Sequence, residues 1–336
     1  MRSAPLGFAF AALVLLAGLV AAFALGRYPV SFGDLVRVLA ARIAGVASDV
    51  APATEAVVFQ IRGPRVLAAV LVGGALATAG TAFQGLFRNP LVSPDILGAS
   101  TGAALGAVLG IYFSLGIVGI EAASFAGGLM AVGAVYGLGA ALRGGDAILV
   151  LVLTGIVVGS LLGAGIGLVK YLADPYNQLP AITFWLLGSL AGIGAADLLP
   201  LAVPVVAGTS VLLLLRWRLN AMSLPEEEAR SLGVATGPLR VAIVAAATLV
   251  TAASVAASGI VGWVGLVVPH LARVLVGPSF PRLLPTAALL GGGYLLLIDT
   301  LARTMASVEV PLGILTAVVG TPVFIAVLAR ARGGWS

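Results

Sequence analysis

Few residues in this sequence could do chemistry, and their spacing excludes the familiar kinds of catalytic site. The chain of 336 residues contains no cysteine, one histidine (His270) and one lysine (Lys170). Disulfides and thiolate sites are therefore excluded, and a lone histidine cannot supply the roughly three or four ligands of a zinc site. The sequence has no G-x-x-x-x-G-K-[ST], H-E-x-x-H or G-x-S-x-G motif. We therefore predict no catalytic residue, no metal site and no bound cofactor, with His270 serving as a hydrogen-bonded structural residue.

The charged residues with the most informative spacing form one acidic run and one isolated pair. Glu226–Glu228 follows Ser223 and Pro225, which predicts a short exposed helix near Pro225–Leu232, capped by Ser223 and closed by Gly233. Two interpretations of this helix remain open, a solvated turn and a docking element for a partner.

Asp299 and Arg303, four residues apart, predict a local ion pair near one end of a helix. The apolar stretches otherwise lack the buried acidic and basic chains of proton- or sodium-coupled transporters. If the protein moves a solute uphill, the energy must come from another chain.

The composition indicates which structural elements hold these residues in place. Of the chain, 60% is hydrophobic and 9% is charged, and the mean hydropathy is +1.15. Soluble domains carry about 25% charged residues, so most of this surface must face lipid. One span needs about 20 apolar residues. We therefore predict an all-α polytopic membrane protein with about ten transmembrane helices in one domain, 1–336. The net charge of +5 is too sparse for a nucleic-acid surface.

The predicted spans are charge-free stretches bounded by charged residues such as Asp95 and Glu121. A turn at Ser254–Gly259 divides the longest stretch into two spans. Pro175–Ala196, with two prolines, is expected to form a short re-entrant or surface helix. We interpret the first stretch as an uncleaved helix, with a signal peptide as the alternative. The stretches are Ser3–Gly26, Val66–Phe87, Ile96–Ile120, Ala122–Leu142, Ala147–Val169, Leu198–Leu215, Val241–Ala272, Leu283–Ile298 and Val310–Ala329.

The basic residues predict the orientation of these spans. With both termini inside, eleven Lys and Arg residues fall on the inner side and seven on the outer side. The positive-inside rule therefore favours N-in and C-in, with Asp95 counted on the inner side. Residues 28–65 then form an outer segment with an amphipathic helix, and 216–240 form the longest inner loop.

Glycine recurs every fourth residue in two of the predicted spans. Gly98, Gly102, Gly106 and Gly110 lie on the third, and Gly155, Gly159, Gly163 and Gly167 on the fifth. Such spacing allows close approach of another helix. The alternative is the wall of a pathway for a bulky solute, and both explanations can hold at different turns.

Several motifs together resemble the FecCD/BtuC-like permease family, the ten-span membrane subunits of ABC importers for iron siderophores, haem or cobalamin. The resemblance runs through 61–103 with its R-N-P-L turn, F-W-L-L-G-S-L (184–190), L-N-A-M-S-L-P-E-E-E-A-R-S-L-G-V (219–234), G-I-V-G-W-V-G-L-V-V-P-H-L-A-R (259–273) and 310–324. It covers most of the chain in order. It implies a BtuC-like fold in a bacterial or archaeal cytoplasmic membrane.

The resemblance also implies partners. Two copies of the permease pair around a pathway, two separate ATPase subunits dock inside and hydrolyse ATP with Mg²⁺, and a periplasmic or lipid-anchored binding protein docks outside. The other partner is membrane lipid, with no nucleic acid. The implied mechanism is alternating access driven by the ATPases.

Site residues follow from the resemblance position by position. The loop after the sixth predicted span matches the coupling helix, and the R-N-P-L turn matches an inner gate. Pro225 and Gly63 depart from the family pattern, which commonly has Gly and Leu there. The implied residues are Glu226, Glu228, Ala229, Leu232 and Gly233 for coupling; Asn89 and Leu91 for the gate; Arg62, Arg65 and Arg303 for docking of the binding protein; and Gly155, Gly159, Gly163, Gly167 and Tyr176 for the pathway.

The expected cargo is an iron chelate, a ferric siderophore or haem, with cobalamin as the alternative within the same family. An ion-coupled secondary transporter is the alternative of a different class. For the three arginines, anchoring at the membrane interface is the alternative to docking.

Overall fold

The computed structural model describes residues 4–142 and 147–331, and these residues are helical with no strand. Seven helices are long and apolar enough to cross a membrane, and three shorter apolar helices accompany them. The helices are α1 (Ala4–Ala24), α2 (Phe32–Ala44), α3 (Pro52–Ala56), the π-helix η1 (Val57–Arg62), α4 (Gly63–Leu86), the 3₁₀-helix η2 (Pro94–Leu97), α5 (Ala99–Tyr112), α6 (Ile117–Ala141), α7 (Ala147–Leu172), α8 (Gln178–Leu186), α9 (Ala195–Leu214), α10 (Arg216–Met222), α11 (Glu226–Ser231), α12 (Thr236–Ser258), α13 (Val264–Val276), α14 (Phe280–Thr304) and α15 (Leu312–Ala331).

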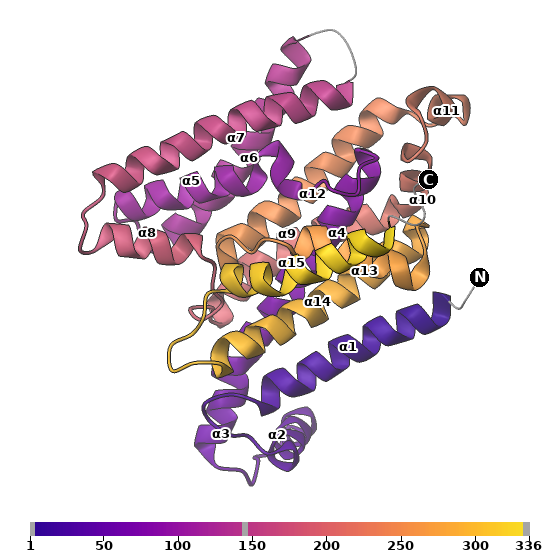
Figure 1. The fold of residues 1–336 in the computed structure, drawn as a ribbon. Coiled ribbons are helices and arrows are strands. Elements are labelled where there is room, and N and C mark those ends of the chain that lie inside the picture. Colours follow the sequence, from indigo (N-terminus) through magenta and orange to yellow (C-terminus); the bar gives the residue numbers. More distant parts are fainter. Residues whose placement is uncertain (1–3, 143–146, 332–336) are drawn as a thin grey trace.

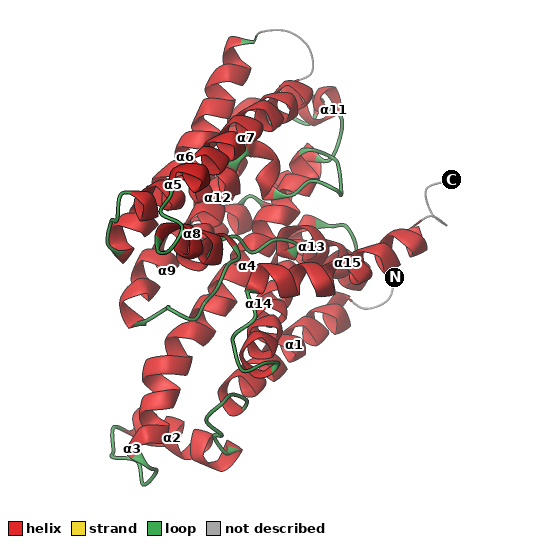
Figure 2. Cartoon of the chain, turned by 60° about the vertical axis from the view of Figure 1, so that its left-hand side comes forward, coloured by secondary structure: helices red, strands yellow, loops and turns green. Residues whose placement is uncertain are grey.

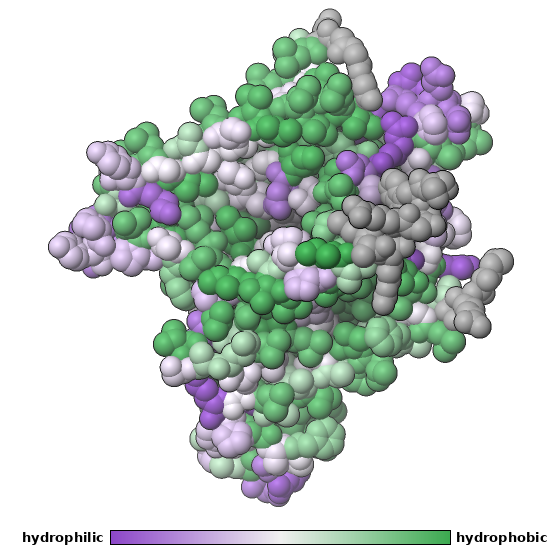
Figure 3. Space-filling model, viewed as in Figure 1, coloured by the Kyte–Doolittle hydropathy of each residue, from purple (hydrophilic) through white to green (hydrophobic). Residues whose placement is uncertain are grey.

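The long helices form a bundle with small elements at its two ends (Figures 1 and 2). α10 and α11 lie at one end, where α1 begins and α15 ends, and α2 and α3 lie at the opposite end. Hydrophilic residues gather around α11 and around the α2–α3 end, with a mostly apolar band between them (Figure 3). This distribution is the one expected for a chain whose middle lies in hydrocarbon.

The structure shifts two predicted span boundaries. α5 ends at Tyr112, and α6 begins at Ile117, so the expected single span Ile96–Ile120 is wrong. Glu121 therefore lies inside α6, and the chain turns at Phe113–Gly116 instead. α14 extends beyond the predicted Leu283–Ile298 because Asp299 and Arg303, treated as boundaries, are paired inside the protein. The short turn expected at 143–146 lies outside the described residues.

The longest apolar stretch divides into α12 and the shorter α13, as predicted, but the break comes later than expected. Helix α12 continues through the predicted turn at Ser254–Gly259, since the Ser254 and Ser258 hydroxyls donate 2.7 Å hydrogen bonds to carbonyls one turn earlier. The break follows at residues 259–263, starting at Gly259 with its positive φ of 66°. The proline-containing stretch forms the short helix α8, as expected.

Close backbone contacts at glycine hold the bundle together. α4 lies at its centre, packed against α14, α12, α13 and α9. A Cβ atom on Gly73 would lie 2.2 Å from the Gly291 carbonyl oxygen of α14. A Cβ on Gly106 would lie 2.0 Å from the Ala123 oxygen of α6, and one on Gly102 2.5 Å from the Gly127 oxygen. For the α5 glycines, therefore, helix packing is the explanation that the structure supports.

The amphipathic helix expected within 28–65 is α2. Ser31 caps it by accepting a 3.0 Å hydrogen bond from the Asp34 amide. Leu35 and Val38 are buried in a small separate core with Val30 and Val58, while the opposite face of α2 is exposed.

The glycine contacts lead to a matched test on α5 and α6. We expect Gly106→Ala to lower the free energy of unfolding by about 1–3 kcal/mol, because the added methyl group would force α5 and α6 apart. Gly133→Ala on α6 meets nothing within 4 Å and should be neutral or slightly stabilising. Thermal unfolding of the two variants in detergent checks this, and equal midpoints would show that the contact tolerates a methyl group.

Candidate functional site

The loop 216–240 forms two short helices, α10 and α11. The expected cap is wrong: Ser223 follows α10 directly and donates a 3.2 Å hydrogen bond to the Leu219 carbonyl, whereas α11 begins after Pro225 with no side-chain cap. Gly233, with φ of 78°, follows the end of α11 as predicted. The predicted short helix is therefore present, but its start is fixed by other residues.

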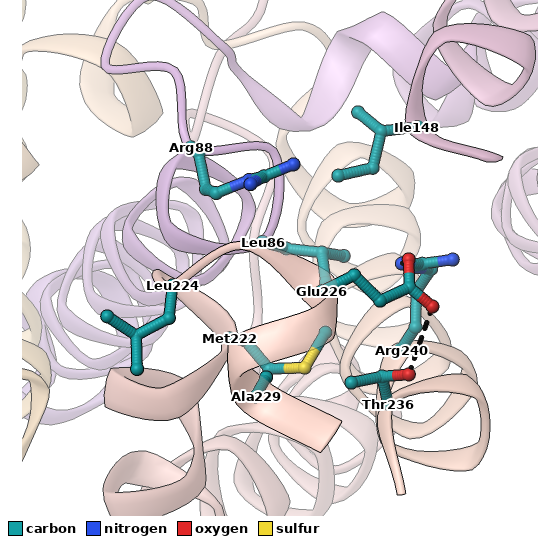
Figure 4. Close-up of a pocket in the computed structure, with 9 residues that line it drawn as sticks. All are labelled: Leu86, Arg88, Ile148, Met222, Leu224, Glu226, Ala229, Thr236 and Arg240. Carbon is teal, nitrogen blue, oxygen red and sulfur yellow. Dashed lines mark hydrogen bonds and ion pairs between the residues drawn. The ribbon is translucent and has the colours of Figure 1, made fainter. Parts of the chain in front are cut away.

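Glu226 fixes α11 to the start of α12 (Figure 4). Its carboxylate lies 2.6 Å from Arg230 Nη2 and 3.0 Å from Arg240 Nη2, and it accepts a 3.1 Å hydrogen bond from Thr236 Oγ1. The hydrogen bond from Arg240 is the main cause that lowers the pKa of Glu226 below its ordinary value. The side chain of Glu226 is therefore engaged within the chain.

The remaining predicted coupling residues fall on two faces of this segment. Ala229 is 1% exposed and lines the same pocket as Glu226 (Figure 4). Glu228, Leu232 and Gly233 are exposed. The face available to a partner chain is therefore the one that carries these three residues.

The predicted gate turn lies beside this loop. Asn89 Oδ1 accepts a 2.9 Å hydrogen bond from the Leu91 amide, and the Asn89 amide donates to the Gln84 carbonyl at 3.1 Å. Leu91 is 55% exposed. Arg88, with a positive φ of 50°, lines the pocket that also contains Leu224 and Glu226 (Figure 4). The structure thus places the R-N-P-L turn and the coupling loop next to each other.

A buried ionic network lies at the α2–α3 end of the bundle. Arg65 contacts Asp299 at 2.9 Å and Glu309 at 2.8 Å, and Arg303 contacts Asp299 at 3.1 Å. Asp299 is 0% exposed. The predicted Asp299–Arg303 pair is confirmed, but it is one edge of a larger network that joins α4, α14 and the α14–α15 loop.

Glu309 is the member of this network that the sequence reasoning missed. Burial tends to raise its pKa, but hydrogen bonds from Arg65 and attraction by Arg65, Arg303 and Arg27 outweigh this and hold the pKa below its ordinary value. The sequence feature that could have identified Glu309 is its position as an isolated acidic residue between Val308 and Val310, just before an apolar stretch. Its partner Arg65 lies 244 residues earlier.

The three predicted docking arginines are all buried. Arg62 donates to the Phe23 and Tyr28 carbonyls, and Arg303 donates to the Ala22 carbonyl. With the Arg65 ion pairs, each guanidinium is engaged inside the chain rather than presented as a free surface charge. Docking at these residues stays a prediction.

The α7 glycines divide between packing and open surface. A Cβ on Gly155 would lie 2.1 Å from the Ile96 carbonyl oxygen, whereas Cβ atoms on Gly159, Gly163 and Gly167 would meet nothing within 4 Å. Tyr176, just beyond α7, is 86% exposed. These three glycines therefore form a smooth strip on α7, exposed at Gly163 and Gly167 and partly exposed at Gly159.

His270 has the structural role expected of it. Its Nδ1 donates a 2.8 Å hydrogen bond to the Leu266 carbonyl, and its ring packs edge-on against Phe324 with 5.6 Å between centroids. Among the described residues, no group of three or more His, Cys, Asp or Glu side chains could hold a metal ion.

Comparisons with known proteins agree with this architecture. A sequence profile of the FecCD transport family matches residues 13–330. The molybdate import system permease protein MolB of Haemophilus influenzae is 39% identical over 96% of this chain and 95% of its own length. The hemin transport system permease protein HmuU of Yersinia pestis is 41% identical over 81% of this chain and 83% of its own length. A solved metal-chelate type ABC transporter in an inward-facing conformation superposes with a TM-score of 0.87 at 37% identity, covering 96% of this chain and 98% of that one.

The Glu226 contacts generate a test with a matched neighbour. In Glu226→Gln the charge that holds Arg240 is lost, and we expect hydrogen exchange in 226–233 to become on the order of fivefold faster, from about 1 kcal/mol of lost bonding. Exposed Glu227→Gln should leave exchange unchanged. The pKa of Glu226 is lowered. In the unmodified chain, the protection of residues 226–233 from hydrogen exchange, after correction for the intrinsic exchange rates, should therefore persist when the pH is below the ordinary pKa of Glu. This protection should disappear as the pH falls through the lowered pKa. Equal exchange in the two variants would contradict the anchoring role.

The ionic network generates a second test. Asp299→Asn leaves Arg65 and Arg303 buried without their shared carboxylate, so we expect the free energy of unfolding to fall by about 3–5 kcal/mol. Asp34→Asn removes the exposed Asp34–Arg37 pair and should change it by less than about 1 kcal/mol. Thermal unfolding in detergent measures both. A loss at Asp299 no larger than at Asp34 would show that the network is not stabilising.

Proposed function

Because the chain belongs to the FecCD transport family, we propose that it is the membrane-spanning permease subunit of a binding-protein-dependent ABC importer. The observation that carries this proposal is the match of nearly the whole chain to a metal-chelate type ABC transporter at 37% identity. The chain has no nucleotide-binding motif, so the ATP that drives transport is hydrolysed with Mg²⁺ on separate subunits. This chain contributes no catalytic residue.

The proposed topology has ten spans with both termini in the cytoplasm. It counts the seven long apolar helices together with the three shorter ones, α5, α13 and α15. The chain is then one permease domain, 1–336, in the cytoplasmic membrane of a bacterium or archaeon. α2 and α3 lie on the outer side, and the loop 216–240 lies in the cytoplasm.

The exposed face of α11 is the proposed contact with the ATPase. Glu228, Leu232 and Gly233 are presented to a partner, whereas Glu226 and Ala229 join α11 to the rest of the chain. Movement of the ATPase is then transmitted through Glu226 and Arg240 to α12, and through the adjoining pocket to the Asn89–Leu91 gate turn.

A second copy of the chain completes the proposed pathway. The glycine strip of α7 (Gly159, Gly163 and Gly167), with Tyr176 at its outer end, would form a smooth wall of a pathway between two copies of the chain. A periplasmic or lipid-anchored binding protein then docks on the outer face. For Arg62, Arg65 and Arg303 to accept its acidic residues, those residues must displace the internal partners.

The proposed cargo is an iron chelate, either a ferric siderophore or haem. The similarity to the hemin permease HmuU and to the metal-chelate type transporter supports this class. The similarity to the molybdate permease MolB over nearly the whole chain makes molybdate a second candidate. Cobalamin remains the alternative implied by the family resemblance.

Transport by the reconstituted complex tests the proposal. The chain, its ATPase and its binding protein are placed in liposomes with ferric siderophores, haem, cobalamin or molybdate outside. We expect uptake of one cargo class that requires both ATP and the binding protein. Glu228→Arg should lower uptake by at least roughly tenfold through loss of the α11 contact, while Arg37→Glu, on α2, should have no such effect.

Two results would overturn parts of this proposal. Uptake driven by a proton or sodium gradient without the ATPase would favour an ion-coupled transporter. Normal coupling in Glu228→Arg would place the ATPase contact outside α11.

A further inference from the structure

The chain is interrupted between α4 and α5, and the interruption lies deep in the bundle. The sequence predicted that Asp95 marks the inner end of a span. In the structure, the chain instead turns back after α4 and enters the bundle again, so that Pro94 in η2 packs against Gly265: a Cβ there would lie 3.1 Å from Pro94 Cδ and 3.0 Å from the Leu76 carbonyl oxygen. Asp95 follows directly.

The depth of this contact follows from the helix crossings. α4 and α14 cross near their midpoints, where Gly73 meets Gly291. Leu76 is three residues further along α4, a rise of about 4.5 Å. Thr251, on the other side of the midpoint of α12, lines the same pocket as Leu76 and Asp95. Gly265 also lies against Gly80 of α4, and the Ile96 carbonyl lies against Gly155 of α7. Asp95 therefore lies inside the bundle, between its middle and the α10–α11 end, and not at the boundary where it was predicted.

A second interruption meets the first at the same depth. The break between α12 and α13 brings Gly262 and Trp263 to the pocket that contains Asp95. Trp263 has a φ of 69°, in a region that non-glycine residues occupy only when their surroundings impose it, as at many functional sites. Its ring packs edge-on against Phe324, 6.2 Å between centroids, and so joins the break to α15.

The pocket at this junction is polar and holds an acid without a basic partner. Its cavity volume is about 20 Å³, and it is lined by Ser93, Asp95, Ser100 and Thr251 among apolar residues. The Asp95 carboxylate accepts hydrogen bonds from the hydroxyls of Ser100 and, at 3.3 Å, Ser93. Among residues 4–142 and 147–331, Asp95 forms no ion pair, and Asp95 is exposed.

An exposed carboxylate at this depth requires water. Charged side chains in the middle of membrane proteins face a water-filled cavity or a partner charge, because hydrocarbon does not solvate them. The adjoining surface is the glycine strip of α7: Gly98 lies against its first glycine, since a Cβ on Gly98 would lie 3.9 Å from Gly159 Cα, and the strip continues to the exposed Gly163 and Gly167. Irregular backbone at membrane depth is likewise tolerated where it lines such a cavity.

We propose that Asp95 lines the translocation pathway within the membrane, on the α10–α11 side of its middle, and acts as a selectivity residue. Its fixed negative charge favours cargo that presents positive charge or hydrogen-bond donors, and it opposes free anions. This inference rests on the proposed transport function for its biological meaning. It also separates the cargo candidates, because it favours neutral or cationic metal chelates over the molybdate dianion.

The chain offers a direct test because it contains no cysteine. In Ser93→Cys, the introduced thiol lies beside the Asp95 carboxylate and can be labelled in membrane vesicles that contain the full-length chain. The probes are a cationic and an anionic methanethiosulfonate of similar size. We expect the ratio of the cationic to the anionic labelling rate to fall about tenfold when Asp95→Asn is added. This is the effect expected when a unit negative charge about 6 Å from the charge of the probe is removed in water. Ser93→Cys with Asp95→Glu should keep the cation preference.

Leu13→Cys, on the exposed apolar face of α1, provides the lipid-facing control. We expect its labelling to be at least roughly tenfold slower than that of Ser93→Cys, because the reacting species is the thiolate. Labelling of Ser93→Cys as slow as this control, or a rate ratio unchanged by Asp95→Asn, would overturn the proposal.

The labelling needs neither cargo nor ATPase, so its failure is distinct from failure of the transport proposal. Charge-sensitive labelling without ATP-driven uptake would leave Asp95 in an aqueous pathway of some other transporter. ATP-driven uptake without labelling at Ser93→Cys would leave the importer and remove Asp95 from its pathway.

Discussion

Inside hydrocarbon, each backbone N–H and C=O group must find its partner within the protein, and this constraint determines where the chain is helical and where it can break. The helix interruptions at residues 87–98 and 259–263 pack against each other inside the bundle. They converge on one polar pocket, with Asp95 on one side and Trp263 on the other. The positions of the breaks and of the pocket thus have the same physical cause. Close packing at Gly73, Gly80 and Gly106 brings the surrounding helices into backbone contact around these breaks.

Local chemistry accounts for what could be predicted from the sequence. Apolar stretches located the long helices, helical periodicity located α2, the acidic run after Pro225 located the short helix α11, and motif resemblance located the family. The misses concern contacts between distant segments. Asp95 was placed at the inner boundary because hydropathy records composition and not depth, and a re-entrant turn after Phe87 leaves little trace in composition. Arg62, Arg65 and Arg303 were predicted to dock the binding protein at the outer face. No residue near them in the sequence indicates that they instead bind Glu309 and the carbonyl groups of residues 22–28.

The ion pairs at the α11 end and at the α2–α3 end involve the same residue types but have different structural roles. At α11, Glu226 binds two arginines at a partly exposed site and leaves the neighbouring Glu228 free. A short helix of six residues would not be stable alone, so this anchoring makes it a rigid element that can transmit force. At the other end, Arg65, Asp299 and Arg303 are almost completely buried and Glu309 is partly exposed, and together they join the beginning of the bundle to its final helices.

That join has a consequence for how the protein is made. Arg65 is synthesised with the second long helix of the chain, whereas Asp299 and Glu309 arrive only with the last two. Until then the early helices carry a guanidinium at the edge of the hydrocarbon with no countercharge, and it must remain at the lipid headgroups. The network is completed only after the chain has been synthesised through Glu309, which follows α14. A chain that stops before Asp299 would therefore keep Arg65 without the carboxylates that pair with it in the complete fold.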